Sequence, residues 1–307
     1  MCRLLGYLGS DLSILDLLYD TDNSLIKQSY QPQLMKTSFM LNLAGFGMMA
    51  WDYASYEPQF PYIYRTTELP FYDRNLAHMA RKLYPNCFLA HIRGTLHRHS
   101  ETINYQNIHP FTIDNSPLAF AHNGSLFGIE KIKKEMMKLI KPCYLNEIKG
   151  TTDSELIYAL FLSQFEHKAD HDDIDKVEKV LVTTLKIIRD LRVRYSLHLN
   201  SPVNLLITNG KFMLATRLTY DYGRYDNLSE LDYVSYHSLW YTFGEIYTKS
   251  DSTPKMQTGE SQKRIIIASE PLTMDTTTWI EVPQYSLLKV SQSETNQYNI
   301  LTKNLDV

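Results

Sequence analysis

The chain has 307 residues, of which 44% are hydrophobic and 21% are charged, and these proportions exclude wholesale disorder and indicate a soluble globular protein. Its formal net charge of −3 provides no positive field to attract nucleic acid or anionic lipid, so we expect a small-molecule substrate, no nucleic acid and no membrane partner. The three cysteines are an odd number and lie far apart, which argues against a disulfide framework and favours a reducing, intracellular setting.

The opening segment carries no sign of a leader peptide. Its apolar runs are short, it is rich in aspartate, and Arg3 is its only basic residue. No later stretch reaches the roughly 18 consecutive apolar residues that a membrane-spanning helix needs. We therefore expect a cytoplasmic protein that keeps Cys2, because a cleaved leader would remove it.

In chain order, the hydrophobic pattern first predicts a buried strand at residues 2–8 and a short helix at 12–19. A glycine-punctuated strand pair is expected at 42–51, and its residues 45–47 are a candidate for a loop that closes over a pocket. The pattern then predicts a helix at 76–83, strands at 87–92 and 118–122, and an amphipathic helix with apolar residues from Ile129 to Ile140 on one face.

The second half of the chain continues with helices and ends in strands. Thr152 and Glu155 have the spacing of a capping box, which predicts a helix from there to about residue 165. The remaining elements are expected as a helix at 172–194, strands at 203–208, 211–216, 240–247, 264–269 and 286–290, and a mobile loop at 251–263. This order suggests a layered α+β protein with sheets at its centre. Because no repeat or long linker interrupts it, we expect a single domain over residues 1–307.

Cys2 is the first candidate for chemistry because of its position. If the initiator Met1 is removed, a thiol and a free α-amine share one residue, and the amine can take the proton of the thiol near neutral pH. The small side chain at position two is compatible with that removal. Taken alone, Cys2 is better explained as a small buried residue of the first strand.

Four further motifs follow Cys2 in a definite order, at residues 90–95, 107–111, 122–124 and 150–155. With the opening Met-Cys-Arg-Leu-Leu, this set resembles the class II glutamine amidotransferases, which are N-terminal-nucleophile hydrolases. It looks most like the stand-alone branch that includes the amidohydrolase of ergothioneine biosynthesis and the amidotransferase-like subunit of glutathione degradation. The resemblance runs from residue 2 to about 161 and resumes at 265–272, and it implies a four-layer αββα sandwich.

The resemblance also implies roles for particular residues. Arg93 would bind the substrate α-carboxylate, with Thr95 assisting there, and Asp153 would hold the α-amino group. The Asn123 side chain and the Gly124 backbone N–H would form the oxyanion hole. His109 falls on a histidine of a family motif, but no catalytic role is assigned to it.

Each of these residues also has a plainer explanation. Arg93 could make a surface ion pair, and Asn123–Gly124 could be an ordinary hairpin turn. Asp153 could serve only as a favourable charge in the first turn of a helix. The sequence also departs from the family at Ala44, where an aspartate is common, and in the residues that follow Arg93.

No cofactor is expected. The sequence lacks the glycine-rich patterns that bind nucleotide phosphates, so nucleotide-dependent synthesis is improbable. His97, His99 and Glu101 could be drawn as a metal site, but a further ligand is missing and exposed loop histidines explain them better. We therefore expect no metal.

The function expected from these features is cleavage of a γ-glutamyl amide through a thioester on Cys2. The substrate could be free glutamine or a larger γ-glutamyl compound, and the ammonia could pass to a separate protein or be released. The alternative is a non-catalytic subunit that retains the fold and binds a γ-glutamyl ligand or a partner. Retention of Met1, which an intact-mass measurement would reveal, would favour that alternative because the α-amine would be blocked.

Overall fold

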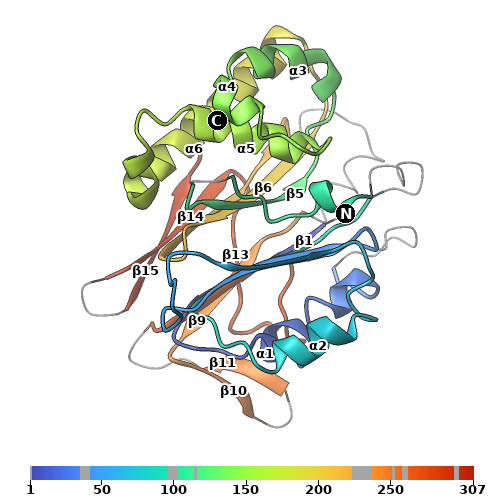
Figure 1. The fold of residues 1–307 in the computed structure, drawn as a ribbon, viewed down its shortest axis with the longest axis vertical. Coiled ribbons are helices and arrows are strands. Elements are labelled where there is room, and N and C mark those ends of the chain that lie inside the picture. Colours follow the sequence, from blue (N-terminus) through green and yellow to red (C-terminus); the bar gives the residue numbers. More distant parts are fainter. Residues whose placement is uncertain are drawn as a thin grey trace.

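The structure is a computed structural model that describes residues 2–34, 42–95, 103–113, 116–222, 237–250, 253–257, 262–293 and 297–307. Two antiparallel sheets stack at its centre and helices cover their outer faces (Figure 1). The first sheet has the strand order β13 (Ile280–Glu281), β9 (Trp240–Gly244), β12 (Arg264–Ala268), β1 (Arg3–Gly9), β4 (Cys87–Ile92), β2 (Phe46–Trp51) and β3 (Tyr62–Thr66).

The second sheet is built from the middle and the end of the chain. Its order is β15 (Tyr298–Asn304), β14 (Ser286–Gln292), β7 (Phe212–Arg217), β6 (Ser201–Thr208) and β5 (Ala119–Gly124), and β8 (Thr219–Tyr220) pairs with β6. A separate hairpin consists of β10 (Ile246–Ser250) and β11 (Thr253–Gln257). The expected strands in this half of the chain are therefore largely confirmed.

Helices form the two outer layers. α1 (Ile14–Leu18) and α2 (Arg74–Ala80) cover the first sheet. The second sheet is covered by α3 (Ile129–Lys138), α4 (Pro142–Leu145), α5 (Asp153–Ser163) and α6 (Ile174–Arg194). Short 3₁₀ turns lie at Lys27–Ser29, Tyr105–Asn107 and Lys168–Asp172. The expected αββα sandwich is confirmed.

The alternation of side chains along the strands fills three layers of core. Leu5 and Tyr7 of β1 point toward α1 and α2, whereas Leu4 and Leu8 point into the space between the sheets. One further step of this alternation puts Cys2 on the inner side, at the end of β1. The first strand therefore directs the second residue of the chain to the end of the space between the sheets.

Three sequence predictions are corrected by the structure. Residues 42–51 do not form a strand pair, because β2 pairs instead with β4 and with β3, a strand that the sequence pattern missed. Residues 45–47 do not close over a pocket, since Gly45 and Gly47 are buried where this segment enters the sheet. The expected loop at 251–263 contains strand β11, and residues 251–252 and 258–261 lie outside the described part.

The structure also decides between the two explanations of the Asn123–Gly124 dipeptide. Both residues lie within β5, where Asn123 is paired with Asn204 and Gly124 with Val203. The alternative explanation of this dipeptide as a hairpin turn is therefore wrong. The similar dipeptide at Asn209–Gly210 does connect two strands, and Gly210 has φ +91° there.

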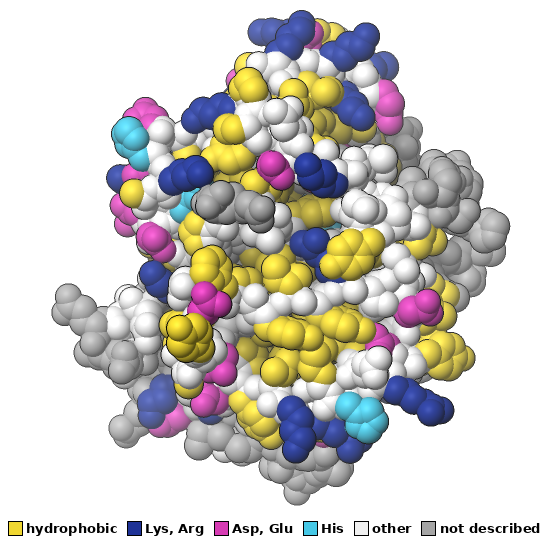
Figure 2. All heavy atoms as spheres, in the orientation of Figure 1, with side chains coloured by type: hydrophobic (Ala, Val, Ile, Leu, Met, Phe, Trp, Pro, Cys, Tyr) yellow, Lys and Arg dark blue, Asp and Glu magenta, His cyan; other side chains and the backbone are white. Residues whose placement is uncertain are grey.

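The surface carries many aromatic side chains. Figure 2 shows hydrophobic side chains gathered on the face turned to the viewer. Phe60 and the edge-strand residues Tyr62 and Ile63 are among the exposed ones, whereas Tyr220 and Tyr247 of the tyrosine-rich C-terminal half are buried. None of the described helices is both long enough and apolar enough to cross a membrane.

Candidate active site

A cavity of about 410 Å³ opens at one end of the sandwich, where strands of both sheets terminate. The first sheet contributes Cys2 before β1 and Arg93 and Thr95 after β4, and the second sheet contributes Gly124 at the end of β5. Asp153 enters from the first turn of α5. Five of the six predicted site residues thus line one cavity, although they come from widely separated parts of the chain.

Cys2 lies against the backbone that follows β4. Its sulfur is 3.5 Å from the N–H of Gly94, which donates to it, and 3.7 Å from the carbonyl oxygen of the same residue, to which the thiol donates. An N–H bond to sulfur becomes stronger when the sulfur is negative, because it is then charge-assisted. The contact therefore suits a nucleophile that passes through a thiolate.

Arg93 is held through its backbone by the segment that precedes β2. The Arg93 N–H donates to the Gly45 carbonyl (2.8 Å), and the Ala44 N–H donates to the Arg93 carbonyl (2.9 Å). Gly45 has φ +121°, and a Cβ there would lie 2.4 Å from Ile108 Cδ1. A glycine is therefore needed at this position, and Ala44 serves the site with its backbone.

Asn123 and Gly124, the residues expected to form the oxyanion hole, lie in different surroundings. Gly124 lines the cavity, and a Cβ on it would lie 1.9 Å from the Pro202 carbonyl oxygen, so no larger residue fits. Asn123 is not among the residues that line the cavity; its side chain is fully buried between the sheets, and its amide contacts Ser269 Oγ at 3.2 Å. Both residues stand at the end of β5 that faces Cys2.

Asp153 is tied to the helix start and to the neighbouring loop. Its carboxylate accepts from the Leu126 N–H (2.6 Å) and from the Ser154 N–H (2.8 Å). Thr152 caps α5 by accepting from the Glu155 N–H, as the capping-box spacing predicted. The reciprocal half of the box is absent, because the Glu155 carboxylate accepts from the Lys149 and Gly150 N–H groups instead.

Three buried histidines lie beside the cavity. The rings of His91 and His109 are 4.2 Å apart, and His122 Nδ1 is 2.8 Å from Ser154 Oγ. Burial lowers the pKa of His91 to about 3, with a further contribution from Arg93. Burial also lowers the pKa of His109 well below its ordinary value, and lowers that of His122 despite the opposing influence of Asp153 and Cys2. All three rings are therefore neutral at pH 7.

The depressed pKa of His91 predicts a pH-dependent stability. In the unfolded chain this imidazole takes a proton below about pH 6.5, whereas in the folded protein it stays neutral down to about pH 3. The free energy of unfolding should therefore fall by about 1.4 kcal/mol per pH unit per such histidine as the pH drops below 6.5. Urea unfolding between pH 7 and pH 4.5 measures this slope.

Two variants isolate the contribution of His91. His91→Gln should flatten the slope by one histidine's share, whatever it does to the stability at pH 7. His78→Gln, on the exposed side of α2, is the matched control and should leave the slope as it is. An unchanged slope in His91→Gln would contradict a neutral buried ring.

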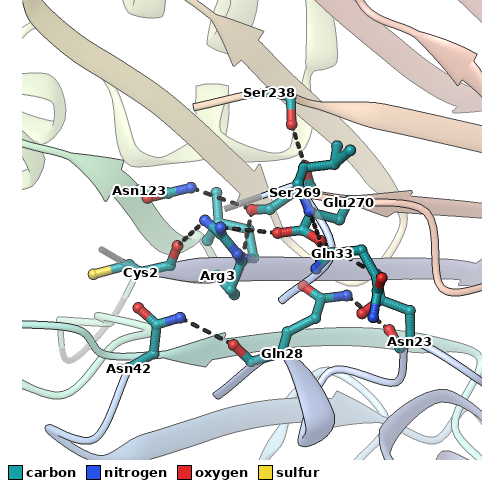
Figure 3. A network of polar contacts seen from close by, with 12 residues as sticks. Cys2, Arg3, Asn23, Gln28, Gln33, Asn42, Asn123, Ser238, Ser269 and Glu270 are labelled. Atoms are coloured by element: carbon teal, nitrogen blue, oxygen red, sulfur yellow. Dashed lines mark hydrogen bonds and ion pairs between the residues drawn. The ribbon is translucent and has the colours of Figure 1, made fainter. Parts of the chain in front are cut away.

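A buried polar network behind Cys2 was not predicted (Figure 3). Arg3 Nη1 donates to the Cys2 carbonyl (2.9 Å), and Arg3 Nη2 lies 2.9 Å from Glu270 Oε1 with both side chains fully buried. The N–H bonds of Arg3 Nη2 do not point at Glu270 Oε1, so charge attraction rather than a directed hydrogen bond holds this pair. Glu270 Oε2 in turn accepts from the Gln33 and Leu34 N–H groups.

The sequence did contain a signal for this network. Ser269 and Glu270 fall in the segment 265–272, which was noted only for its resemblance to the family. Their pairing with residues near the N-terminus follows from β12 lying beside β1, with Ala268 opposite Leu5. Only the strand order brings the two ends of the chain together.

The structure adds no metal site. Within the described ranges, no group of three or more histidine, cysteine or acidic side chains could hold a metal ion. His97, His99 and Glu101 lie outside those ranges. The cavity offers a thiol, a guanidinium and a carboxylate, which suit covalent catalysis on a small molecule that carries both a carboxylate and an amine.

Comparisons with known proteins identify the family of this chain. The family model described as glutamine amidotransferases class-II matches residues 47–304, a range that begins beyond Cys2. The chain is similar to the probable glutamine amidotransferase DUG3 of Saccharomyces cerevisiae, with 27% identity over 306 residues that cover 95% of this chain and 82% of that protein. It also matches an uncharacterized protein of Methanocaldococcus jannaschii, with 29% identity over 136 residues, 44% of this chain and 32% of that one.

Solved structures show the same fold at lower sequence identity. A class-II glutamine aminotransferase domain protein from Silicibacter pomeroyi superposes with a TM-score of 0.60 and 19% identity over 99% of both chains. The glutamine phosphoribosylpyrophosphate amidotransferase of B. subtilis gives a TM-score of 0.59 and 15% identity, over all of this chain and 50% of that one. This chain therefore corresponds in fold to about half of the larger enzyme.

Proposed function

Since this chain belongs to the class II glutamine amidotransferases, we propose that it cleaves a γ-glutamyl amide with Cys2 as the nucleophile, after Met1 has been removed. The observation that carries this proposal is the placement of the Cys2 thiol in one cavity with Arg93 and Asp153. A nucleophile, a cation and an anion meet there around a space of suitable size for a small molecule.

Arg93 and Asp153 are proposed to recognise the amino acid end of the substrate. A guanidinium fork suits a planar carboxylate, and a carboxylate attracts an ammonium group. Thr95, beside Arg93 on the same cavity wall, assists at the substrate carboxylate. These contacts fix the α-carbon, so that the γ-carbonyl extends toward Cys2.

The proposed reaction proceeds in two stages. The Cys2 sulfur attacks the γ-carbonyl carbon, and the α-amine of Cys2 takes the thiol proton and passes it to the leaving nitrogen, so that ammonia or an amine departs and a γ-glutamyl thioester remains. Water then adds to the thioester, glutamate leaves and the thiol is restored. The Gly124 N–H and the Asn123 amide stabilise the negative oxygen in both stages.

The leaving group distinguishes two candidate substrates. Free glutamine and a larger γ-glutamyl compound share the amino acid end, so Arg93 and Asp153 bind both alike. Glutamate release from glutamine and from γ-glutamyl peptides, assayed side by side, decides between them. Any ammonia formed passes to a separate protein or to solvent.

We also infer that residues 1–307 act as one amidotransferase domain. β1, at the start of the chain, pairs with β12 near its end, and α6 packs on the sheet that contains the last strands. Removal of either end of the chain would expose core residues that pack against the other end.

Asn123→Ala should lower kcat for glutamate release by about 100- to 1000-fold, since removal of one oxyanion donor has that effect elsewhere. KM should change little, because the amide contributes mainly in the transition state. Steady-state kinetics measure both constants. Asn204→Ala is the control for the removal of a buried amide, because Asn204 lies opposite Asn123 on β6 and its amide bonds the His237 carbonyl and the Leu218 N–H. Wild-type kcat in Asn123→Ala would remove Asn123 from the mechanism.

A further inference from the structure

We propose that Ser269 is a positioning residue that determines which end of the Asn123 amide is presented to the oxyanion. This inference rests on the oxyanion role proposed above. Ser269 is fully buried and directly follows β12, whereas Asn123 stands at the end of β5 in the other sheet. Their contact therefore joins the two sheets beside the nucleophile.

Ser269 is fixed by the first strand. Its N–H donates to the Leu4 carbonyl (3.0 Å), and its Oγ accepts from the Leu4 N–H (2.9 Å). The serine thus continues the pairing of β12 with β1, using its side chain for one of the two bonds. Since Leu4 is two residues from Cys2, Ser269 Oγ has a fixed position relative to the nucleophile.

The two orientations of the Asn123 amide make different hydrogen bonds with Ser269. With Nδ2 toward Ser269, the serine oxygen accepts from both Leu4 and Asn123, and Asn123 Oδ1 is buried without a hydrogen-bond partner among the described residues. A half-turn of the amide exchanges Oδ1 and Nδ2 with little other movement. The Ser269 hydroxyl then donates to Oδ1, which satisfies those two groups and leaves the N–H bonds of Nδ2 for the oxyanion.

This orientation prepares the site for catalysis. With Oδ1 held by Ser269, the two N–H bonds of Nδ2 occupy the other end of the amide, which Figure 3 shows directed away from Ser269 and above Cys2. An N–H donor can stabilise a negative oxygen there, whereas a carbonyl oxygen would repel it. Ser269 therefore favours the useful orientation by offering Oδ1 a hydrogen-bond donor.

Glu270, the residue after Ser269, connects Cys2 to the end of β12. Glu270 pairs with Arg3, whose guanidinium donates to the Cys2 carbonyl. The Ser238 hydroxyl donates to the Ser269 carbonyl (2.8 Å) on the far side. The end of β12 thus holds both the main chain of Cys2 and the side chain of Asn123.

The test is a double-mutant cycle of Ser269→Ala and Asn123→Ala, with glutamate release measured on the better of glutamine and a γ-glutamyl peptide. Ser269→Ala alone should lower kcat by about tenfold with little change in KM, the effect of losing one orienting hydrogen bond. In the Asn123→Ala background the same change should have almost no further effect, because the amide that it orients is gone. Ser238→Ala is the matched hydroxyl deletion and should retain wild-type kcat.

A second readout excludes a purely structural effect. Alkylation of Cys2 by iodoacetamide needs no oxyanion hole, so its rate should be equal in Ser269→Ala and the wild type. If alkylation falls as much as kcat, or if the two substitutions lower kcat additively, Ser269 does not act through Asn123 and the inference is wrong. If Asn123→Ala itself has wild-type kcat, the oxyanion assignment fails first and the role of Ser269 fails with it.

Discussion

Cys2→Ala is expected to abolish glutamate release, with a loss of kcat on the order of 10⁶-fold, comparable to nucleophile removal in a covalent hydrolase of another kind. The physical reason is that Cys2 carries the only thiol among the described residues that line the cavity, so no other side chain there can form the thioester. The measurement is glutamate release under single-turnover conditions, with mass spectrometry of the wild-type protein to detect the γ-glutamyl adduct on Cys2.

Two controls make this result specific. Cys143→Ala removes the exposed cysteine on α4, far along the chain from the site, and should retain full activity. Cys2→Ala should still bind glutamate, because Arg93 and Asp153 are intact. Retention of amidase activity by Cys2→Ala would end the proposed mechanism.

The intact mass of the purified protein completes the test. A mass that lacks Met1 together with an active wild type supports catalysis by a free N-terminal cysteine. A wild type that retains Met1, binds glutamate and releases none from any γ-glutamyl substrate would favour the non-catalytic binding subunit instead.

Glu270→Gln is expected to destabilise the protein by about 3–5 kcal/mol, because it leaves the Arg3 guanidinium buried without its counter-charge. Both side chains of this ion pair are fully inaccessible to solvent. Arg3 cannot move to water, since its Nη1 is also bonded to the Cys2 carbonyl within the sheet. Urea unfolding at pH 7 measures the loss.

An exposed pair of the same chemistry provides the comparison. Arg217 and Glu281 are 2.7 Å apart, but the Glu281 side chain is 45% exposed, so Glu281→Gln should cost under about 1 kcal/mol. Adding Arg3→Met to Glu270→Gln should recover part of the lost stability, because no charge then remains buried alone. Equal costs at Glu270 and Glu281 would show that the buried pair has no special role.

Local pattern predicted most of the elements. The alternation of apolar residues identified β1, β4, β6 and β12, and the spacing of Thr152 and Glu155 marked the start of α5. The edge strand β3 was missed because its outward side chains are exposed tyrosine and isoleucine, so the alternation of polar and apolar residues is absent. The last strand, β15, was missed as well, since it buries little beyond Tyr298.

The candidate site, like the fold, was predicted only in part. The order of the motifs predicted that Cys2, Arg93, Gly124 and Asp153 belong together, and the structure brings them to one cavity. Taken alone, the Asn123–Gly124 pair favoured a turn, because a dipeptide's own conformational preference carries no information about the strand that lies beside it. Pairing with β6 decided in favour of the strand.

The sequence by itself determined which residues alternate into a core, where helices begin, and that a cysteine stands beside the initiator methionine. These are local properties, set by side-chain size, polarity and spacing. Only the tertiary structure decided that Ser269 meets Asn123 and that Glu270 neutralises Arg3, because those contacts depend on the order and register of strands far apart in the chain. The free energy of burying a charge or orienting an amide arises from that three-dimensional arrangement and has no local signature.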